Sequence, residues 1–301
     1  TITKDDGIRY VYGIPAYNVD KKEVSFNISG TTDSISENLT RYEGSYVTHK
    51  NNTNGLSHSF SSTKTPGYAY AYLLTDIVSP DYVDRTADGP SPDDNGTYTK
   101  FNYHKTNSNY RWRMPYLKNS AHYQSNTNNL HTQSDGDDIA SFMYGEKEVW
   151  YNQSVETKNY VALFYYSPRS DARGVLDEDG GIDRANADQQ LLKLDSISLF
   201  TRVSPGIPIQ TVHFEYDYSL CKGTPTNPDN YSSSGFNTVP IPVNDTTRGK
   251  LTLKRIYFTY QNSKKGKLIR YTFAYQNNQN YNDAKNNRWG NYKDYKGDFT
   301  G

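Results

Sequence analysis

The amino-acid sequence predicts an all-β fold of consecutive antiparallel β-hairpins, with long polar loops and very little helix. Three observations support this fold class: an internal repeat, an alternation of apolar and polar residues, and the near absence of a sustained helical period. The repeat is defined by residues that recur 59 positions later, namely Leu192 and Leu251, Leu194 and Leu253, Ile197 and Ile256, Leu199 and Phe258, Phe214 and Phe273, and Tyr216 and Tyr275. Each copy therefore predicts a hairpin in which a Leu-x-Leu-x-x-Ile strand precedes a Phe-x-Tyr strand.

The composition supports a folded chain without a strong charge preference. The 301 residues include 33 basic and 33 acidic side chains, so no net field favours nucleic acid or an anionic membrane. The chain is polar and rich in Asn, but 29 Tyr, 11 Phe and 3 Trp supply the apolar area that disordered chains lack. Cys221 is the only cysteine, which excludes an intramolecular disulfide, a thiolate zinc site and a CxxC redox pair.

Residues 1–66 are predicted to contain N-terminal strands and a polar insertion. Residues 10–12 and 24–28 alternate apolar and polar side chains, and Pro15 lies between them. This arrangement predicts two short strands with an irregular connection. Residues 30–66 consist largely of Ser, Thr, Asn and Gly, which predicts a long loop.

Residues 67–275 are predicted to form the repeated hairpin region, with units near 68–103, 144–166, 192–216 and 251–275. The first unit is a looser copy, because residues 81–96 are inserted between its two strands. The second unit has a short polar turn at 156–159. The last two units are the copies that share the full pattern, so they are the most strongly predicted hairpins.

The remaining segments carry weaker signals. Residues 104–138 are polar, with Arg111-Trp112-Arg113 and Pro115 as the only part that suggests structure. Residues 185–194 have enough helical character for one or two turns. Residues 276–301 are expected to form an extended exit segment.

Two Asp-rich loops are candidate calcium sites, because Ca²⁺ takes about six to eight oxygen ligands from carboxylates and carbonyls on a turning backbone. The candidate ligands are Asp84, Asp88 and Asp93, with Asp94, in the first loop, and Asp177, Asp179 and Asp183, with Asp188 beyond, in the second. The second loop has the better geometry, since its carboxylates alternate along a turn that contains two glycines. The alternative interpretation of each loop is a solvated acidic turn. A weaker third cluster consists of Asp135, Asp137 and Asp138.

Signals for other chemistry are weak, so the chain is predicted to be non-enzymatic. His213 alternates with Val212 and Phe214, which places it on the solvated face of a strand. Carboxylates two positions apart on a strand, which suit glycoside hydrolysis, are Glu146 with Glu148 and Glu215 with Asp217. Any charged strand offers such pairs. The rings that could form a carbohydrate-stacking platform, or equally fill hairpin cores, are Trp112, Trp150 and Trp289.

The second copy of the repeat carries a resemblance to a known family. The run from Leu251 to Ile256, preceded by Arg248-Gly249-Lys250 and followed by Phe273-Ala274-Tyr275, resembles the Gly-x-Leu-x-x-Ile and Phe-x-Tyr units of Rhs/YD-repeat proteins and of toxin-complex B components. Residues 9–15, 212–222 and 288–292 are similar to stretches of very large surface proteins of the Bacteroidetes. The resemblance implies a curved sheet or β-shell in which neighbouring hairpins cover each other's edges. The Tyr-Asp repeat of that family is not regular here, and no aspartyl autoprotease motif is visible.

Together, these expectations predict that the chain is a structural segment of a large bacterial protein that is secreted or displayed on the cell surface. Such a wrapper would enclose or display a toxin or effector, and its partners would be the remainder of the polypeptide or neighbouring hairpins. The chain opens on Thr1, so we expect a piece of a longer polypeptide, and no apolar run approaches the roughly 20 residues of a membrane span. The alternative is a surface adhesin or carbohydrate-binding module, with or without Ca²⁺. The residues expected to face one buried layer are Leu194, Ile197, Phe214, Leu253, Ile256 and Phe273.

Overall fold

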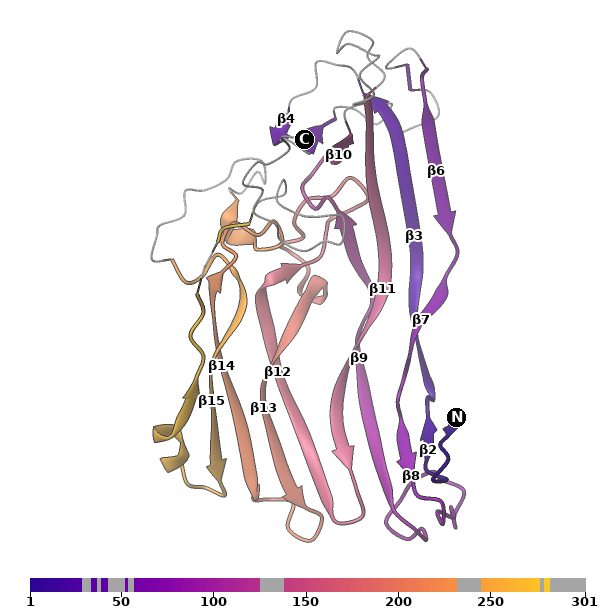
Figure 1. Ribbon diagram of the computed structural model, residues 1–301, viewed down its shortest axis with the longest axis vertical. Helices are drawn as coiled ribbons and strands as arrows, with labels where there is room; N and C mark the ends of the chain where they lie inside the picture. Colours follow the sequence, from indigo (N-terminus) through magenta and orange to yellow (C-terminus); the bar gives the residue numbers. More distant parts are fainter. Residues whose placement is uncertain are drawn as a thin grey trace, which may run out of the picture.

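The computed structural model describes residues 1–28, 34–36, 39–42, 52–53, 57–124, 138–231, 245–276 and 279–281. Within these residues the chain forms one large antiparallel sheet, and its only helices are short 3-10 turns, which confirms the all-β prediction (Figure 1). The strands are β1 (Ile2–Thr3), β2 (Arg9–Val11), β3 (Ile14–Ile28), β4 (Ser34–Ser36), β5 (Leu39–Arg41), β6 (Phe60–Thr65), β7 (Tyr68–Leu73), β8 (Asp76–Val78), β9 (Tyr98–Met114), β10 (Ser120–Gln124), β11 (Asp138–Glu156), β12 (Tyr160–Arg173), β13 (Gln190–Thr201), β14 (Gln210–Leu220), β15 (Lys250–Tyr260) and β16 (Arg270–Thr272). The 3-10 turns are η1 (Ala187–Gln189), η2 (Pro228–Asn230) and η3 (Lys265–Leu268).

The sheet is organised as four long two-stranded ribbons that stand side by side. In the first ribbon, β2 pairs with β8, and β3 pairs with β6 and β7. The other three ribbons pair β9 with β11, β12 with β13, and β14 with β15. Figure 1 shows the two strands of each ribbon crossing near the middle of their length. The chain therefore builds most of its hydrogen bonds inside ribbons, between strands that twist around each other.

Neighbouring ribbons are joined over only a few residues, mostly at one end. The short ladders pair β8 with the first residues of β9, β11 with β12 over Ser154–Glu156, and β13 with β14 over Ser196–Leu199. The exception is β3, which pairs with β11 over ten positions. The turns after β11, β13 and β15 lie at the lower end in Figure 1, and the longer connections after β12 and β14 lie at the upper end.

A β-bulge explains the three-residue spacing of Leu194 and Ile197 in the first copy of the repeat. Along β12, Phe164 and Tyr166 are two residues apart and share a face. Their partners on β13 are Ile197 and Leu194, so Asp195 is an extra residue without a position of its own in the ladder. The bulge keeps both apolar side chains of β13 on one face of the sheet.

The second copy of the repeat contains the same bulge. Phe214 and Tyr216 of β14 pair with Ile256 and Leu253 of β15, and Lys254 is the extra residue. Because bulges increase the local right-handed twist of a strand pair, these extra residues account for part of the crossing of the strands in both ribbons. The Leu-x-x-Ile motif is thus a signature of local geometry as well as of hydrophobicity.

The register separates the two faces of this part of the sheet by chemistry. One face, which we call the apolar face, carries Phe164, Tyr166, Leu194, Ile197, Leu199, Val212, Phe214, Tyr216, Leu253, Ile256, Phe258 and Tyr271. The opposite face is mainly polar on β14 and β15 and mixed on β12 and β13; it carries Val161, Leu163, Tyr165, Ser196, Ser198, Phe200, Thr211, His213, Glu215, Arg255, Tyr257, Thr259, Arg270 and Thr272. The ladder thus places His213 on the polar face, as predicted.

The fully buried core lies elsewhere, at the upper end of the molecule, where the long connections pack against β3, β10 and β11. Its members are Val24, Phe26, Ile28, Tyr42, Tyr116, Ala121, Ala140, Phe142, Tyr144, Val175, Ile182 and Tyr231. The rings of Phe26 and Phe142 meet edge to face with their centroids 6.3 Å apart. Burying each such large side chain contributes about 1.5–3 kcal/mol.

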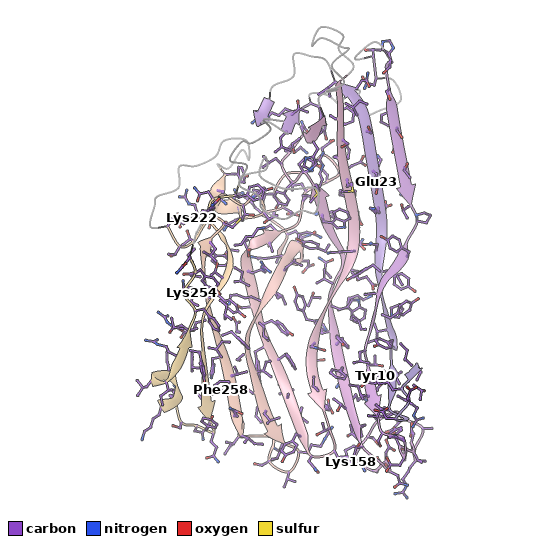
Figure 2. The ribbon with its side chains drawn as sticks, in the orientation of Figure 1. Tyr10, Glu23, Lys158, Lys222, Lys254 and Phe258 are labelled. Carbon is purple, nitrogen blue, oxygen red and sulfur yellow. The ribbon has the colours of Figure 1, made fainter. Side chains whose placement is uncertain are left out.

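The predicted buried layer is therefore wrong. Leu194, Ile197, Phe214, Leu253 and Ile256 are half-buried, and Phe273 is 37% exposed. The register does place the first five on one face. Figure 2 shows a single layer of strands in this part of the molecule, so among the described residues no second layer covers that face. Alternation along a strand predicts which residues share a face and leaves open what packs on it.

Four further predictions also need correction. The strand β3 runs unbroken through Pro15, which occupies the second position of the strand, where a missing N–H is tolerated. Short strands β4 and β5, and then β6, lie within the predicted loop at 30–66, whose remainder falls partly outside the described residues. The polar stretch after residue 104 belongs to the long strand β9, and η1 supplies only a single turn before β13 begins at Gln190.

Candidate functional site

The second Asp-rich loop folds around the guanidinium group of Arg113, at the end of β9. Arg113 Nε donates to the carbonyl oxygen of Glu178 at 2.7 Å. Its Nη1 donates to the carbonyl oxygens of Pro115 and Leu117, the latter at 3.4 Å, and its Nη2 donates to the hydroxyl of Tyr42 at 3.0 Å. One carbonyl oxygen of the loop, that of Glu178, thus joins three oxygen atoms from other segments around a positive charge that the chain itself supplies.

The surroundings hold this guanidinium rigidly. Arg113 is 5% exposed, and its guanidinium carbon lies 4.3 Å from the centre of the Phe142 ring. Burial lowers the pKa of Arg113, and the hydroxyl of Tyr42 acts in the opposite direction. Gly180 has a φ of +87°, and a Cβ there would lie 2.7 Å from the carbonyl oxygen of Leu117. The glycine of the predicted calcium loop is required because the loop backbone presses against these groups.

The three carboxylates of this loop bind different partners. Asp177 pairs with Lys118 at 3.0 Å, and Asp183, which is nearly buried, pairs with Arg111 at 2.6 Å. Asp179 accepts a hydrogen bond of 3.1 Å from the hydroxyl of Tyr42. Each carboxylate is therefore engaged with a basic or hydroxyl group, and the loop acts as a structural clamp.

The first Asp-rich loop is stabilised by its own backbone. The Asp84 carboxylate accepts hydrogen bonds from the N–H groups of residues 86, 87 and 89. Asp88 accepts from the hydroxyl of Thr86 at 2.7 Å, and Asp93 accepts from the same hydroxyl at 3.5 Å. Asp94 is buried and accepts from the hydroxyl of Tyr82 at 2.8 Å. These contacts are typical of a self-capped turn.

The arrangement gives the calcium hypothesis no support. Across the described ranges, no three His, Cys, Asp or Glu side chains are placed to hold a metal ion together. Asp135 and Asp137 lie outside the described residues, and only the backbone of Asp138 is described. Calcium binding by Asp84, Asp88 and Asp93 or by the second loop stays a prediction.

The carboxylate pairs considered for acid and base chemistry are also engaged. Glu148 accepts hydrogen bonds from Lys105 at 2.7 Å, from the Trp150 indole at 3.1 Å and from the backbone N–H of Tyr17 at 3.2 Å. Burial by itself raises the pKa of Glu148, but these hydrogen bonds bring it below its ordinary value. Glu146 accepts a hydrogen bond from a tyrosine hydroxyl. Glu148 thus joins three strands as a fixed carboxylate.

The second pair lies on the polar face of β14. Glu215 pairs with Arg255 of β15 at 3.2 Å. Asp217 accepts a hydrogen bond of 2.7 Å from the hydroxyl of Ser219 and lies 3.8 Å from Lys254. Both carboxylates therefore form cross-strand contacts of the kind that stabilise sheets.

The tryptophans do not form the expected platform. The Trp112 indole packs against Gly145, where a Cβ would lie 2.7 Å from the ring. Lys105 lies over the ring of Trp150, 5.1 Å from its centre. Trp289 lies outside the described residues. One group of exposed aromatic residues consists of tyrosines of β3 and β7, namely Tyr17 (42% exposed), Tyr68 (40%), Tyr70 (46%) and Tyr72 (62%).

These tyrosines were missed because their signal was interpreted only as strand propensity. In β7 the exposed tyrosines at 68, 70 and 72 alternate with Ala69 and Ala71, which are half-buried. Two of the hydroxyls are anchored: Tyr68 accepts from Asn18 at 2.7 Å, and Tyr70 donates to the carbonyl oxygen of Glu148 at 3.0 Å. We call Tyr17, Tyr68, Tyr70 and Tyr72 the tyrosine cluster.

A groove with a largely polar lining lies at the lower end of the molecule. It is lined in part by Asp76, Lys100, Asn102, Ser154 and Glu156. The Glu156 carboxylate accepts hydrogen bonds from Asn102 at 2.7 Å and from Arg202 at 2.6 Å. The principal carboxylate of the groove is therefore already paired across three strands.

Comparison with known proteins leaves the family open. No family model matches the chain, and no curated protein or solved structure is significantly similar to it. Within the described part of the chain, no helix has the length and apolar character needed to span a bilayer. The functional argument therefore depends on the architecture and on the chemistry of the two faces.

Proposed function

We propose that this chain is a non-enzymatic structural segment of a larger bacterial β-assembly, secreted or displayed on the cell surface. In this proposal the ribbons form part of a wall that encloses or displays another component, such as a toxin or effector. The wall would continue in further ribbons, in line with the resemblance to Rhs/YD-repeat proteins and toxin-complex B components.

The observation that carries the proposal is the amphipathic character of a single layer of strands. Three neighbouring strands, β13 to β15, place most of their large apolar side chains on the apolar face and mainly hydroxyl or charged side chains on the other, whereas β12 carries apolar side chains on both faces. The polar face is internally satisfied: the hydroxyls of Ser198 and Thr211 are 2.8 Å apart, and His213 Nε2 lies 2.9 Å from the hydroxyl of Thr259. Extended apolar surfaces in soluble proteins mark interfaces, so the apolar face is the side expected to meet another component.

The test is the mass and the terminal sequences of the native polypeptide, isolated from its source with an antibody against this chain. The expected result is a polypeptide much longer than 301 residues that carries further Leu-x-Leu-x-x-Ile and Phe-x-Tyr units. A native polypeptide without any further unit would overturn the proposal.

A second candidate function, carbohydrate binding, is favoured by the tyrosine cluster. Exposed rings held by hydrogen bonds are suited to stack on sugar rings, because they are apolar and lose little freedom on binding. A panel of bacterial and host polysaccharides, screened with and without Ca²⁺, tests it. Retention that is lost in Tyr72→Ala and kept in Tyr165→Ala, a matched exposed tyrosine of β12, would support this function, and retention lost in neither variant would exclude the cluster.

A further inference from the structure

The edge strand β16 is the counterpart of β14 in the second copy of the repeat. The ladder between β13 and β14 pairs Ser196 with His213, Ile197 with Val212 and Ser198 with Thr211. The ladder between β15 and β16 pairs Arg255 with Thr272, Ile256 with Tyr271 and Tyr257 with Arg270. Each residue of the second set follows its counterpart by 59 positions, so the repeat extends to the hydrogen-bond register.

The two counterparts differ in what lies on their other side. β14 continues to Leu220 and is paired by β15 along most of its length. β16 ends at Thr272, and among the described residues only β15 pairs with it. β14 has β15 on its other side. By the repeat, a strand of the β15 type would occupy the corresponding position beside β16.

The side chains around β16 are exposed where those of β14 are covered. Val212, Phe214 and Tyr216 are half-buried. Their counterparts and the residues that lead into β16 have these exposed fractions: Leu268 85%, Ile269 82%, Tyr271 65%, Phe273 37% and Tyr275 44%. A neighbouring strand of the β15 type would cover this apolar row.

The backbone of β16 also presents unpaired positions toward the open side. The Phe273 N–H donates to the carbonyl oxygen of Lys254 in β15 at 2.9 Å. Successive residues of an antiparallel strand direct their backbone groups to opposite sides, so the N–H and C=O of Thr272 point away from β15. Such an edge is a template for strand addition.

We propose that β16 is a docking edge for a β-strand that carries the bulged Leu-x-Leu-x-x-Ile pattern of β15. The inference rests on the proposed function, since that strand would begin the next ribbon of the wall. Its leucine, isoleucine and aromatic side chains would lie opposite Tyr271, Phe273 and Tyr275, as those of β15 lie opposite Val212, Phe214 and Tyr216.

A second copy of this chain is a poor source of that strand. The two strands with the pattern, β13 and β15, are each paired on both sides within the sheet. The residues directly after β16, up to Tyr275, lie along β15: the hydroxyl of Tyr275 donates to the carbonyl oxygen of Leu253 at 2.7 Å, and Lys254 lies over the Tyr275 ring. Figure 2 labels Lys254 and Phe258 on this flank of the molecule, where the incoming strand would lie. Docking therefore needs little rearrangement.

The experiment uses the full chain and a fluorescent synthetic peptide with the sequence of residues 248–262, which contains β15 and its flanks. Fluorescence anisotropy measures its binding to the wild-type protein, to Thr272→Pro and to Thr272→Val. The expected result is binding to wild type and Thr272→Val, and a loss of about tenfold or more for Thr272→Pro, because proline removes the outward N–H and leaves the ladder to β15 intact. A control peptide with Ile256→Asp and Phe258→Asp should not bind.

A second readout does not depend on any variant. Amide exchange in the wild-type protein should slow at Thr272 and Ala274 when the peptide is added, and circular dichroism verifies that each variant is folded. Absence of peptide binding, equal binding to Thr272→Pro, or a wild-type dimer that Thr272→Pro converts to a monomer would each overturn the proposal, the last by pointing to a second copy at the edge. A long native polypeptide combined with no peptide binding would refute the docking edge alone, whereas a native polypeptide without further units would refute the proposed function alone.

Discussion

Asp195 of β13 and Lys254 of β15 occupy the same position in neighbouring ribbons. Each is the extra residue of a β-bulge, without a partner residue in the ladder with β12 or β14, respectively. Deleting Lys254 leaves Leu253 and Ile256 two residues apart, so both stay on the apolar face. We expect a loss of about 1–2 kcal/mol from the hydrogen bond that Lys254 accepts from Phe273. Urea denaturation measures the free energy of unfolding.

The matched control is deletion of Tyr257, which has a regular partner in His213. This deletion moves every preceding residue of β15 to the opposite face and should cost about 4 kcal/mol or more, as for the loss of several packed side chains. Equal losses for the two deletions would contradict the assignment of Lys254 as the extra residue.

Gly249 is required by the close approach of two backbone segments. A Cβ there would lie 2.1 Å from the carbonyl oxygen of Leu220 and 2.4 Å from that of Tyr218. Gly249→Ala should therefore destabilise the protein by about 2–3 kcal/mol, because both obstacles are backbone atoms. Gly206→Ala is the control, since a Cβ at Gly206 has no neighbour within 4 Å, and thermal unfolding should separate the two variants. A Gly249→Ala protein as stable as Gly206→Ala would be at odds with this packing.

Arg113→Met should be among the most damaging single substitutions in the upper core. It removes the donors for the carbonyl oxygens of Pro115, Leu117 and Glu178 and leaves them buried, at an expected loss of about 3–5 kcal/mol. Arg85→Met is the matched control, because Arg85 is exposed and its side chain forms one long hydrogen bond of 3.5 Å. Chemical denaturation of both variants measures the difference, and a loss below about 1 kcal/mol for Arg113→Met would mean that solvent replaces the guanidinium.

Glu148 should give the protein a measurable sensitivity to acid. Its pKa is lowered in the folded state, so the unfolded state binds more protons in the interval between the two pKa values. The stabilisation is complete above the ordinary carboxyl value of 4.5 and is lost as the pH falls through the lowered value. Glu148→Gln should cost about 1–2 kcal/mol at neutral pH and much less near pH 3, as measured by urea denaturation at both pH values.

The control for this pH effect is Glu23→Gln. The Glu23 side chain is 51% exposed and pairs only with Lys21 among the contacts described for it, and exposed pairs contribute little. A Glu148→Gln difference that does not change between neutral and acidic pH would show that the carboxylate contributes by shape rather than by charge.

The part of the fold that could be predicted from sequence is the part held by local pairing. β13 and β14, like β11 and β12, are joined by short turns, and their alternation is readable because side chains on a strand have a period of two. The core could not be predicted in this way. Phe26 and Phe142 lie on strands far apart in the sequence, and the loops that bury them carry no periodic signal.

The same limit applies to the second Asp-rich loop. Its acidic residues and glycines predicted a shell of carboxylate and carbonyl oxygen atoms around a cation; the shell that is present surrounds Arg113, and among its carbonyl oxygens only that of Glu178 comes from the loop. A turn that binds a guanidinium has the same composition as one that binds calcium. Only the position of β9, which brings Arg113 to the loop, separates the two possibilities.

The short ladders between ribbons have a mechanical consequence. The joints between β11 and β12 and between β13 and β14 share three and four residue pairs, whereas the pairs inside each of these ribbons are far more numerous. The angle at a joint can therefore change while every ribbon keeps its own hydrogen bonds. Curvature becomes an adjustable property of this part of the layer, and in the proposed wall the same sequence would fit components of different diameter.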